Sequence, residues 1–348
     1  MTTLVLGDLH VGNLKFCGGP LRQGLNDRAR AILQSVEDCV RYFVQNCGVT
    51  SVVQLGDFFD QPRPSPALVD ASLHMIRATG VPWHILAGNH DLASHDAPSA
   101  LAPMNHVEGV YIYEKASIGL VDGLPWAMCP YTGPSAEDAL QELLEAIKGH
   151  PTPVQHGAVH YGLVDSRLTE LRTDLVTKDS MQRIFENQYT YLFFGHEHNS
   201  RVSAGRWVSL GGFTHTGFGD TEVPCVGLVS AKGTSLHAWR GTSRFCSNFR
   251  SVCLDRGMLR WLLADMRAHW PGYYLIHQAH EEVAKALVEA GLIAGYKLWE
   301  AGENVAEELE AYEPSSAPMD AVYEVLAEVA PQDVIEEVFA LVEEDMKS

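Results

Sequence analysis

The stretch Gly88-Asn89-His90-Asp91 is the part of this sequence from which its fold can be worked out. It follows the short apolar run Trp83-His84-Ile85-Leu86, whose composition predicts a β-strand. Four other polar motifs also stand just after strand-like apolar runs. They are Gly7-Asp8-Leu9-His10, Gly56-Asp57-Phe58-Phe59-Asp60, the single His160, and Gly195-His196-Glu197-His198. Polar residues scattered over surface loops would show no such register, so the pattern places these motifs at strand ends.

Helical patterns separate the first of these predicted strands, at about residues 27–46 and 65–79. Strands that alternate with helices indicate an α/β fold in which ligands bind at the carboxyl ends of the strands. A glycine stands directly before the donor residue in most of the motifs, and glycine allows the backbone to turn sharply and approach a bound group closely. The sequence therefore predicts one site assembled from several strand ends.

The motifs supply seven nitrogen and oxygen donors: Asp8, His10, Asp57, Asn89, His160, His196 and His198. A catalytic metal ion takes about three protein ligands and keeps a position open for water, so seven donors fit two ions that share a carboxylate. Taken singly, Asp8 or Asp57 could be an ordinary turn carboxylate and His160 a core histidine. Because all of the motifs stand directly after predicted strands, a shared metal site is favoured over these separate roles. Imidazole, carboxylate and amide oxygen without thiolate suit manganese, iron, zinc or magnesium.

In this order the motifs resemble the five blocks of the calcineurin-like metallophosphoesterase superfamily, D-x-H, G-D-x-x-D, G-N-H-D, H and G-H-x-H, over about residues 1–240. The resemblance implies an α/β fold with a metallophosphoesterase β-sandwich flanked by helices. It also implies which donors hold each ion. One ion would be held by Asp8, His10, Asp57 and His198, and the other by Asp57, Asn89, His160 and His196, with Asp57 bridging. Two ions about 3.5–4 Å apart support in-line phosphoryl displacement by an activated water.

The same resemblance implies a catalytic role for His90, which stands beside a predicted ligand without being needed as one. In the family this histidine protonates or stabilises the leaving oxygen, a general-acid role that suits imidazole near neutral pH. We expect Asp91 to orient His90.

The residues flanking the blocks resemble the SbcD nuclease family. The run from Gly56 to Asp60 is followed by Arg63-Pro64-Ser65, and the segment from Ser209 to Asp220 partly matches the family's segment after the last ligand pair. Protein serine/threonine phosphatases differ, since they have Arg-Gly after the second block and glutamate at the position of Asp91. The resemblance implies a manganese-dependent DNA nuclease, acting in repair or recombination as a homodimer with an SMC-like coiled-coil ATPase of the SbcC type. We expect Arg63 to bind the DNA substrate.

Two other functions stay open at this point. A phosphoesterase acting on nucleotides or cyclic nucleotides would use the same blocks. A catalytically minor scaffold of an ATPase complex is the second alternative, although such scaffolds usually lose ligands and this chain retains all seven donors and His90. Further candidate phosphate-binding cations are dispersed along the sequence: Arg167, Arg172, Lys178 and Arg201.

The length of 348 residues leaves room for more than the metallophosphoesterase domain. We expect that domain at 1–242, a small α/β capping domain at 243–312, and an acidic helical tail at 313–348. Residues 281–348 carry 18 acidic and 3 basic residues, a net −15 of the total −19, so the catalytic part is nearly balanced. This weakens the objection that an acidic protein binds DNA poorly.

The tail contains two apolar helical stripes, one with Val325 and Val329 and one with Val338 and Leu341. A stripe of this kind needs a surface to cover it, and we expect the coiled coil of the ATPase partner to do so. The alternative is that the two helices fold back on their own chain.

Cysteine usage predicts the compartment. Seven cysteines, an odd number without a C-x-x-C pair, suit reduced thiols in a cytoplasmic protein, or in the host cytoplasm if the chain is phage-encoded. We see no signal segment and no apolar run of about 18 residues, so no membrane association is expected.

Overall fold

The computed structural model describes residues 1–12, 21–94, 98–164, 172–185, 190–198, 203–216, 220 and 223–239. After residue 248 it describes 249–252, 273–277, 285, 288 and 295–299. The chain divides into two units. The first comprises Met1–Gly12, Ala29–Thr216 and Asp220–Thr242, and it contains all of the predicted site residues.

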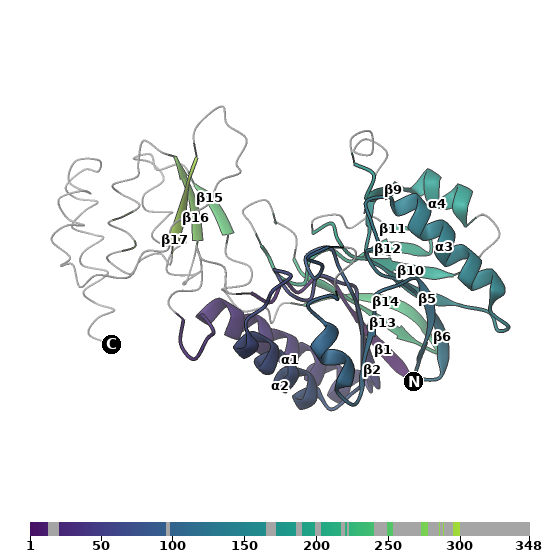
Figure 1. Ribbon diagram of the computed structural model, residues 1–348, viewed down its shortest axis with the longest axis horizontal. Helices are drawn as coiled ribbons and strands as arrows, with labels where there is room; N and C mark the ends of the chain where they lie inside the picture. The colour runs from purple at the N-terminus through teal and green to yellow at the C-terminus, as the bar shows by residue number, and fades with distance from the viewer. Residues whose placement is uncertain are drawn as a thin grey trace. The chain divides into compact units, whose positions relative to one another are not determined.

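Two six-stranded sheets form the first unit (Figure 1). One has the order β14 (Gly233–Ala238), β13 (Cys225–Ser230), β1 (Thr2–Leu6), β2 (Ser51–Gln54), β3 (Trp83–Leu86) and β4 (Val110–Tyr113). The other has the order β11 (Ser203–Ala204), β12 (Trp207–Ser209), β10 (Tyr191–Phe194), β7 (His156–Val159), β6 (Leu124–Cys129) and β5 (Ser117–Val121). A separate pair, β8 (Gly162–Val164) and β9 (Leu175–Thr177), completes the described strands of this unit.

The two sheets pack against each other through one buried apolar cluster. It contains Val5, Val53 and Leu86 from the first sheet and Trp126 and Phe193 from the second. Burial of such side chains contributes roughly 1.5–3 kcal/mol each, so this interface is a main source of stability. The predicted β-sandwich is confirmed.

Helices cover the outer faces of the sandwich. Figure 1 shows α1 (Asp27–Cys47) and α2 (Pro66–Thr79) on one side, and α3 (Ala136–Gly149) and α4 (Lys178–Ile184) on the other. A second buried cluster joins Leu140 and Leu143 of α3 and Met181 of α4 to Leu192 and Phe194 of β10. A short 3-10 helix, Ala102–His106, precedes β4.

The residues at the two ends of α2 explain where this helix begins and ends. Ser65 caps α2, since its side chain accepts a hydrogen bond from the Leu68 amide at 3.2 Å, and Pro66 fills the first turn. Gly80 ends the helix in the left-handed conformation, with φ 72°. Both helices predicted at 27–46 and 65–79 are confirmed within one residue at each end.

Parallel pairing brings the motif-bearing strand ends together. In the first sheet Leu6 lies opposite Gln54, and β2 in turn runs parallel to β3. In the second sheet Val159 at the end of β7 lies opposite Phe194 at the end of β10. The carboxyl ends of parallel strands share one sheet edge, so each sheet presents its polar motifs at a single edge.

The second unit contains a three-stranded parallel sheet, β15 (Phe249–Val252), β16 (Tyr273–His277) and β17 (Gly295–Trp299). The domain boundaries predicted at 242 and 312 stay predictions. The predicted tail helices, with Val338 and Leu341, lie outside the described residues. Within the described part of the chain, no helix combines the length and apolarity needed to cross a membrane.

Candidate metal centre

Three of the seven predicted donors have an unusual backbone conformation. The φ angles are 45° at His10, 49° at Asp57 and 76° at His196, all in the left-handed region. Residues other than glycine rarely adopt it, and each costs on the order of 1–3 kcal/mol unless the surrounding structure enforces it. Such strain is concentrated at functional sites, and here it fixes the direction of the side chains.

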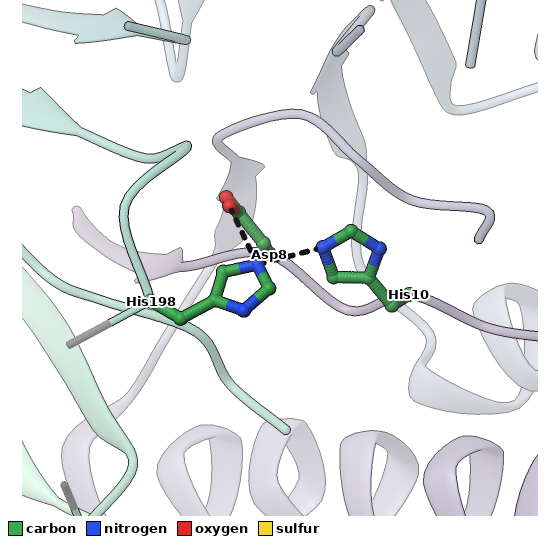
Figure 2. Close-up of side chains that lie close together, drawn as sticks. All are labelled: Asp8, His10 and His198. Carbon is green, nitrogen blue, oxygen red and sulfur yellow. Dashed lines mark hydrogen bonds and ion pairs between the residues drawn. The ribbon is translucent and has the colours of Figure 1, made fainter. Parts of the chain in front are cut away.

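The first group of donors consists of Asp8, His10 and His198, whose ligand atoms lie within 4.8 Å of one another. Nε2 of His198 lies 2.9 Å from Nε2 of His10 and 3.8 Å from Oδ2 of Asp8. Figure 2 shows the carboxylate of Asp8 and a ring nitrogen of His10 both directed toward His198. The geometry suits three ligands of one ion.

The second group consists of Asp57, His160 and His196, which also lie within 4.8 Å of one another. Oδ1 of Asn89 lies 3.0 Å from Nε2 of His160 and 2.9 Å from Nδ1 of His196. Asn89 therefore joins this group as the fourth donor.

Asp57 connects the two groups. Its Oδ2 lies 3.6 Å from Nε2 of His10, and its Oδ1 lies 3.4 Å from Nε2 of His160. Each oxygen thus faces a different group, which is the arrangement required of a bridging carboxylate. The structure brings all seven predicted donors together around this residue.

The chemistry of the donor set fits two divalent cations. Asp8 is completely buried, and its Oδ1 has no hydrogen-bond partner among the described residues. A buried charged oxygen without a partner is costly, and a bound cation would remove that cost. The surroundings are also shaped for close approach, because a Cβ at Gly195 would lie 2.5 Å from that oxygen and a Cβ at Gly88 would collide with Asp57.

The electrostatics of the buried groups agree with this reading. Burial raises the pKa of Asp8. Burial acts in the same direction on Asp57, but the charge of His160 lowers the pKa of Asp57 below its usual range. Burial acts to lower the pKa of His160, but the charge of Asp57 raises this pKa to about 9. The buried donors therefore interact strongly with one another.

His90 is exposed beside this centre. Its backbone amide donates to Oδ1 of Asp57 at 2.8 Å, and its Nδ1 lies 3.0 Å from the carbonyl oxygen of Asp60. A carbonyl only accepts, so Nδ1 carries the proton of this bond and Nε2 is available to a substrate. The ring packs edge-on against His10, with centroids 4.8 Å apart.

Asp91 does not contact the His90 ring in the way the sequence suggested. Its buried carboxylate accepts backbone hydrogen bonds from Phe58 at 3.2 Å, Phe59 at 2.9 Å and Gly88 at 2.9 Å. These amides belong to the loops that carry Asp57 and Asn89, and as buried donors they need an acceptor. Asp91 ties the two loops together, whereas a main-chain carbonyl holds His90.

An open cavity of about 440 Å³ lies over the centre. Its lining includes Asp57, Asn89, His90, His196 and His198, together with Arg172, Asp174, Glu197 and Asp220. The predicted substrate-binding Arg63 is exposed on the loop before α2 and does not line the cavity. Among the lining residues the arginine is Arg172, one of the dispersed cations in the sequence.

Two carboxylates at the cavity contact the outer nitrogens of predicted ligands. Nε2 of His196 lies 2.7 Å from Oδ2 of Asp174, and Nδ1 of His198 lies 3.3 Å from Oδ2 of Asp220. Burial acts to raise the pKa of Asp174, but hydrogen bonds from Arg172 and His196 lower it to about 2. Sequence reasoning missed Asp174, which belongs to none of the five motifs.

The pKa values of His196 and His198 are shifted in opposite directions. Burial lowers the pKa of His196 to about 4, and the charge of His160 acts in the same direction. Burial also opposes the charged form of His198, but the hydrogen bond to Asp220 raises its pKa to about 8.

Comparison with known proteins identifies the class. The family model described as calcineurin-like phosphoesterase matches residues 1–200, more than half of the chain. The chain therefore belongs to the calcineurin-like phosphoesterase family, and the superfamily predicted from the five motifs is confirmed. The protein is a member of a hydrolase superfamily with a candidate dimetal centre.

No curated protein matches the sequence. Among solved structures, a dimetal phosphatase from Danio rerio is similar to this chain, with 13% identity and a TM-score of 0.45, over 69% of this chain and 99% of that chain. The finer assignment to the SbcD type stays a prediction.

Proposed function

We propose that this protein is a two-metal-dependent DNA nuclease that hydrolyses phosphodiester bonds. The observation that carries the hydrolytic part is the position of Asp57, with one oxygen toward each group of donors. Asp8, His10, Asp57 and His198 would hold one divalent ion, and Asp57, Asn89, His160 and His196 the other, most suitably Mn²⁺. Such ions supply an activated water and neutralise charge on the phosphoryl oxygens.

The chain's own contribution to bond cleavage centres on His90. Its Nδ1–H is held by the Asp60 carbonyl, so the ring presents Nε2 at the cavity. In its imidazolium form, with a second proton on Nε2, the ring can donate that proton to the leaving oxygen of a phosphodiester, a step worth typically about 10²–10⁴-fold in rate. The Asp57 contact to the His90 amide keeps the ring beside the centre.

The choice of DNA as substrate is supported by sequence features. The run around Phe58 and Phe59 and the Arg63-Pro64-Ser65 flank resemble the SbcD family, and the acidity of the chain is concentrated after residue 280. Arg63 is exposed outside the cavity. A cation there would contact a polymer beyond the reacting phosphate, which favours a nucleic acid over a small ester.

A second candidate is hydrolysis of nucleotides or cyclic nucleotides, which would use the same polar cavity. A scaffold without catalysis is less well supported, because all seven donors and His90 are present and converge.

The proposal includes the setting of the reaction. The nuclease would act in DNA repair or recombination as a homodimer, with an SMC-like coiled-coil ATPase bound through residues 313–348. A cytoplasmic location is supported by Cys39, Cys47 and Cys129, which are free thiols in the described part of the chain.

The test uses the purified full chain with Mn²⁺ on linear duplex DNA, single-stranded DNA, cyclic nucleotides and phosphomonoesters. We expect cleavage of DNA that EDTA abolishes and that His90→Gln strongly reduces. His74→Gln is the matched control, because His74 is exposed on α2 away from the cavity. Efficient hydrolysis of cyclic nucleotides or monoesters with intact DNA, with and without a cognate ATPase, would favour the second candidate.

A further inference from the structure

The outer nitrogens of His196 and His198 each face a carboxylate from outside the five motifs that supply the donors. We propose that Asp174 and Asp220 are positioning residues, each serving one of the two metal sites. Asp174 would support the site of His160 and His196, and Asp220 the site of His10 and His198. This inference rests on the proposed two-metal centre and assigns a function to two residues in it.

The His196 ring has a partner at each of its two nitrogens. Nδ1 lies 2.9 Å from Oδ1 of Asn89, inside the second donor group, and Nε2 lies 2.7 Å from Oδ2 of Asp174. A histidine that binds a metal through Nδ1 must carry its proton on Nε2. Nη2 of Arg172 also lies 3.0 Å from Nε2, but the contact to Asp174 is shorter and leaves Nδ1 free to bind a metal. A carboxylate that accepts the Nε2 proton orients the ring and makes Nδ1 a better donor.

Arg172 holds Asp174 in this position. Its Nε donates to Oδ1 of Asp174 at 3.0 Å and its Nη2 donates to Oδ2 at 2.8 Å, a two-point contact. Its Nη1 also pairs with Glu197 at 2.6 Å, in the loop between His196 and His198. A bidentate arginine–carboxylate pair has a defined geometry, so the oxygen that faces His196 is fixed.

Asp220 has the corresponding place at His198. Nε2 of His198 lies 2.9 Å from Nε2 of His10 in the first donor group. Nδ1 lies 3.3 Å from Oδ2 of Asp220 and 3.0 Å from the hydroxyl oxygen of Thr216, which itself donates to Asp220. The amide and hydroxyl of Thr216 donate to the same carboxylate oxygen at 2.7 and 3.0 Å. Asp220 is therefore held by its own segment, independently of Arg172.

The remaining two histidines are supported differently. Nδ1 of His160 donates to the carbonyl oxygen of Leu55 at 2.8 Å, a main-chain contact. Nδ1 of His10 lies 3.6 Å from Oδ1 of Asp60, beyond hydrogen-bond distance. Among the described residues, side-chain carboxylates thus support one histidine of each donor group at hydrogen-bond distance, and the two sites can be weakened separately.

The experiment measures Mn²⁺ binding to the full chain by calorimetric titration, together with electron paramagnetic resonance of the coupled pair. Asp174→Ala and Asp220→Ala are compared with Asp179→Ala, an exposed aspartate on α4 away from the cavity. Each test variant should lose about 10–100-fold in affinity at one of the two binding steps, the usual effect of removing a partner of a metal ligand. The control should leave both steps unchanged.

Double-mutant cycles identify which site is affected. Asp174→Ala should cause no further loss when His196→Ala is already present, but its full loss in the presence of His198→Ala. Asp220→Ala should behave in the opposite way. Interactions that act through one ligand are non-additive with that ligand, and we expect them to be additive with a ligand that the carboxylate does not contact.

The outcomes separate this inference from the proposed function. A wild-type chain that binds no pair of ions removes the two-metal centre and the proposed function with it. A wild-type chain that binds two ions with unchanged affinities in both variants, or with additive losses in every cycle, overturns the assignment of Asp174 and Asp220 alone. If an alanine variant melts earlier than the control in EDTA, the cycles are run with Asp→Asn, which keeps the side-chain shape. Absence of the ligand-specific loss there overturns the inference as well.

Discussion

Oδ1 of Asp57 lies 3.4 Å from Nε2 of His160, although the two residues belong to loops of different sheets. The other oxygen of the same carboxylate faces His10, at 3.6 Å from its Nε2. The φ angle of 49° at Asp57 is part of this arrangement, because it directs the side chain between the two groups of donors. One residue therefore joins the edges of two sheets into a single centre.

His90→Gln tests the leaving-group role. The variant should keep both metal sites, because His90 contacts the centre mainly through its backbone amide. The turnover on substrates with poor leaving groups should fall by about 10²–10⁴-fold, the usual contribution of general acid catalysis. The loss should be much smaller on bis-p-nitrophenyl phosphate, since nitrophenolate leaves without a proton. An equal loss on both kinds of substrate would contradict the acid role.

Gly88→Ala tests the close packing of the centre. A Cβ at this position would collide with the side chain and the amide of Asp57, so the bridging carboxylate would have to move. We expect reduced Mn²⁺ affinity at both sites, measured by calorimetric titration. Gly149→Ala is the control, because a Cβ there meets open space. Wild-type affinity in the Gly88 variant would show that the position of Asp57 does not determine metal binding.

His84 predicts a pH dependence of stability away from the metal centre. Burial lowers its pKa from 6.5 to about 4, with Asp122 acting in the opposite direction, while its ring stacks on Tyr111 and contacts the Tyr113 hydroxyl. The neutral ring therefore stabilises the fold above pH 6.5. That stabilisation, on the order of 3 kcal/mol, is lost as the pH falls from about 6.5 toward 4.

Urea unfolding in EDTA at several pH values checks this expectation. The stability of His84→Gln should fall less than that of the wild type over this pH range, because glutamine does not titrate. His74→Gln, on the exposed face of α2, should follow the wild type. Parallel curves for the wild type and His84→Gln would refute the prediction.

Removal of the tail tests partner docking. Truncation after Glu313 should leave metal binding and basal DNA cleavage unchanged and abolish co-purification with the ATPase. Replacing Val338 and Leu341 by aspartate should have the same effect without removing residues. If either change unfolds the catalytic unit, the tail packs on its own chain and the docking proposal fails.

The seven donors could be predicted because each stands in a short motif directly after an apolar run. Local patterns of this kind specify strands, and parallel pairing then brings their ends to one edge. The caps of α2 were predictable on the same grounds, since Ser65, Pro66 and Gly80 act within their own turn.

The residues that hold the donors in place could not be predicted in the same way. Asp174 precedes β9 and His196 follows β10, so their contact is made by the folded chain, and no spacing in the sequence encodes it. Asp91 accepts hydrogen bonds from the buried amides of Phe58 and Phe59, and this pairing is visible only in the folded chain. The sequence around Arg63 favours it as the substrate-binding arginine, whereas the arginine that lines the cavity is Arg172.

Anomalous diffraction from crystals of the full chain grown with Mn²⁺ tests the two-metal centre most directly. We expect two manganese peaks about 3.5–4 Å apart, the spacing of two-metal sites, with one oxygen of Asp57 on each ion. His10 and His198 should ligate one peak, and Asn89 and His160 the other. A single peak, or two ions that do not share Asp57, would contradict the account.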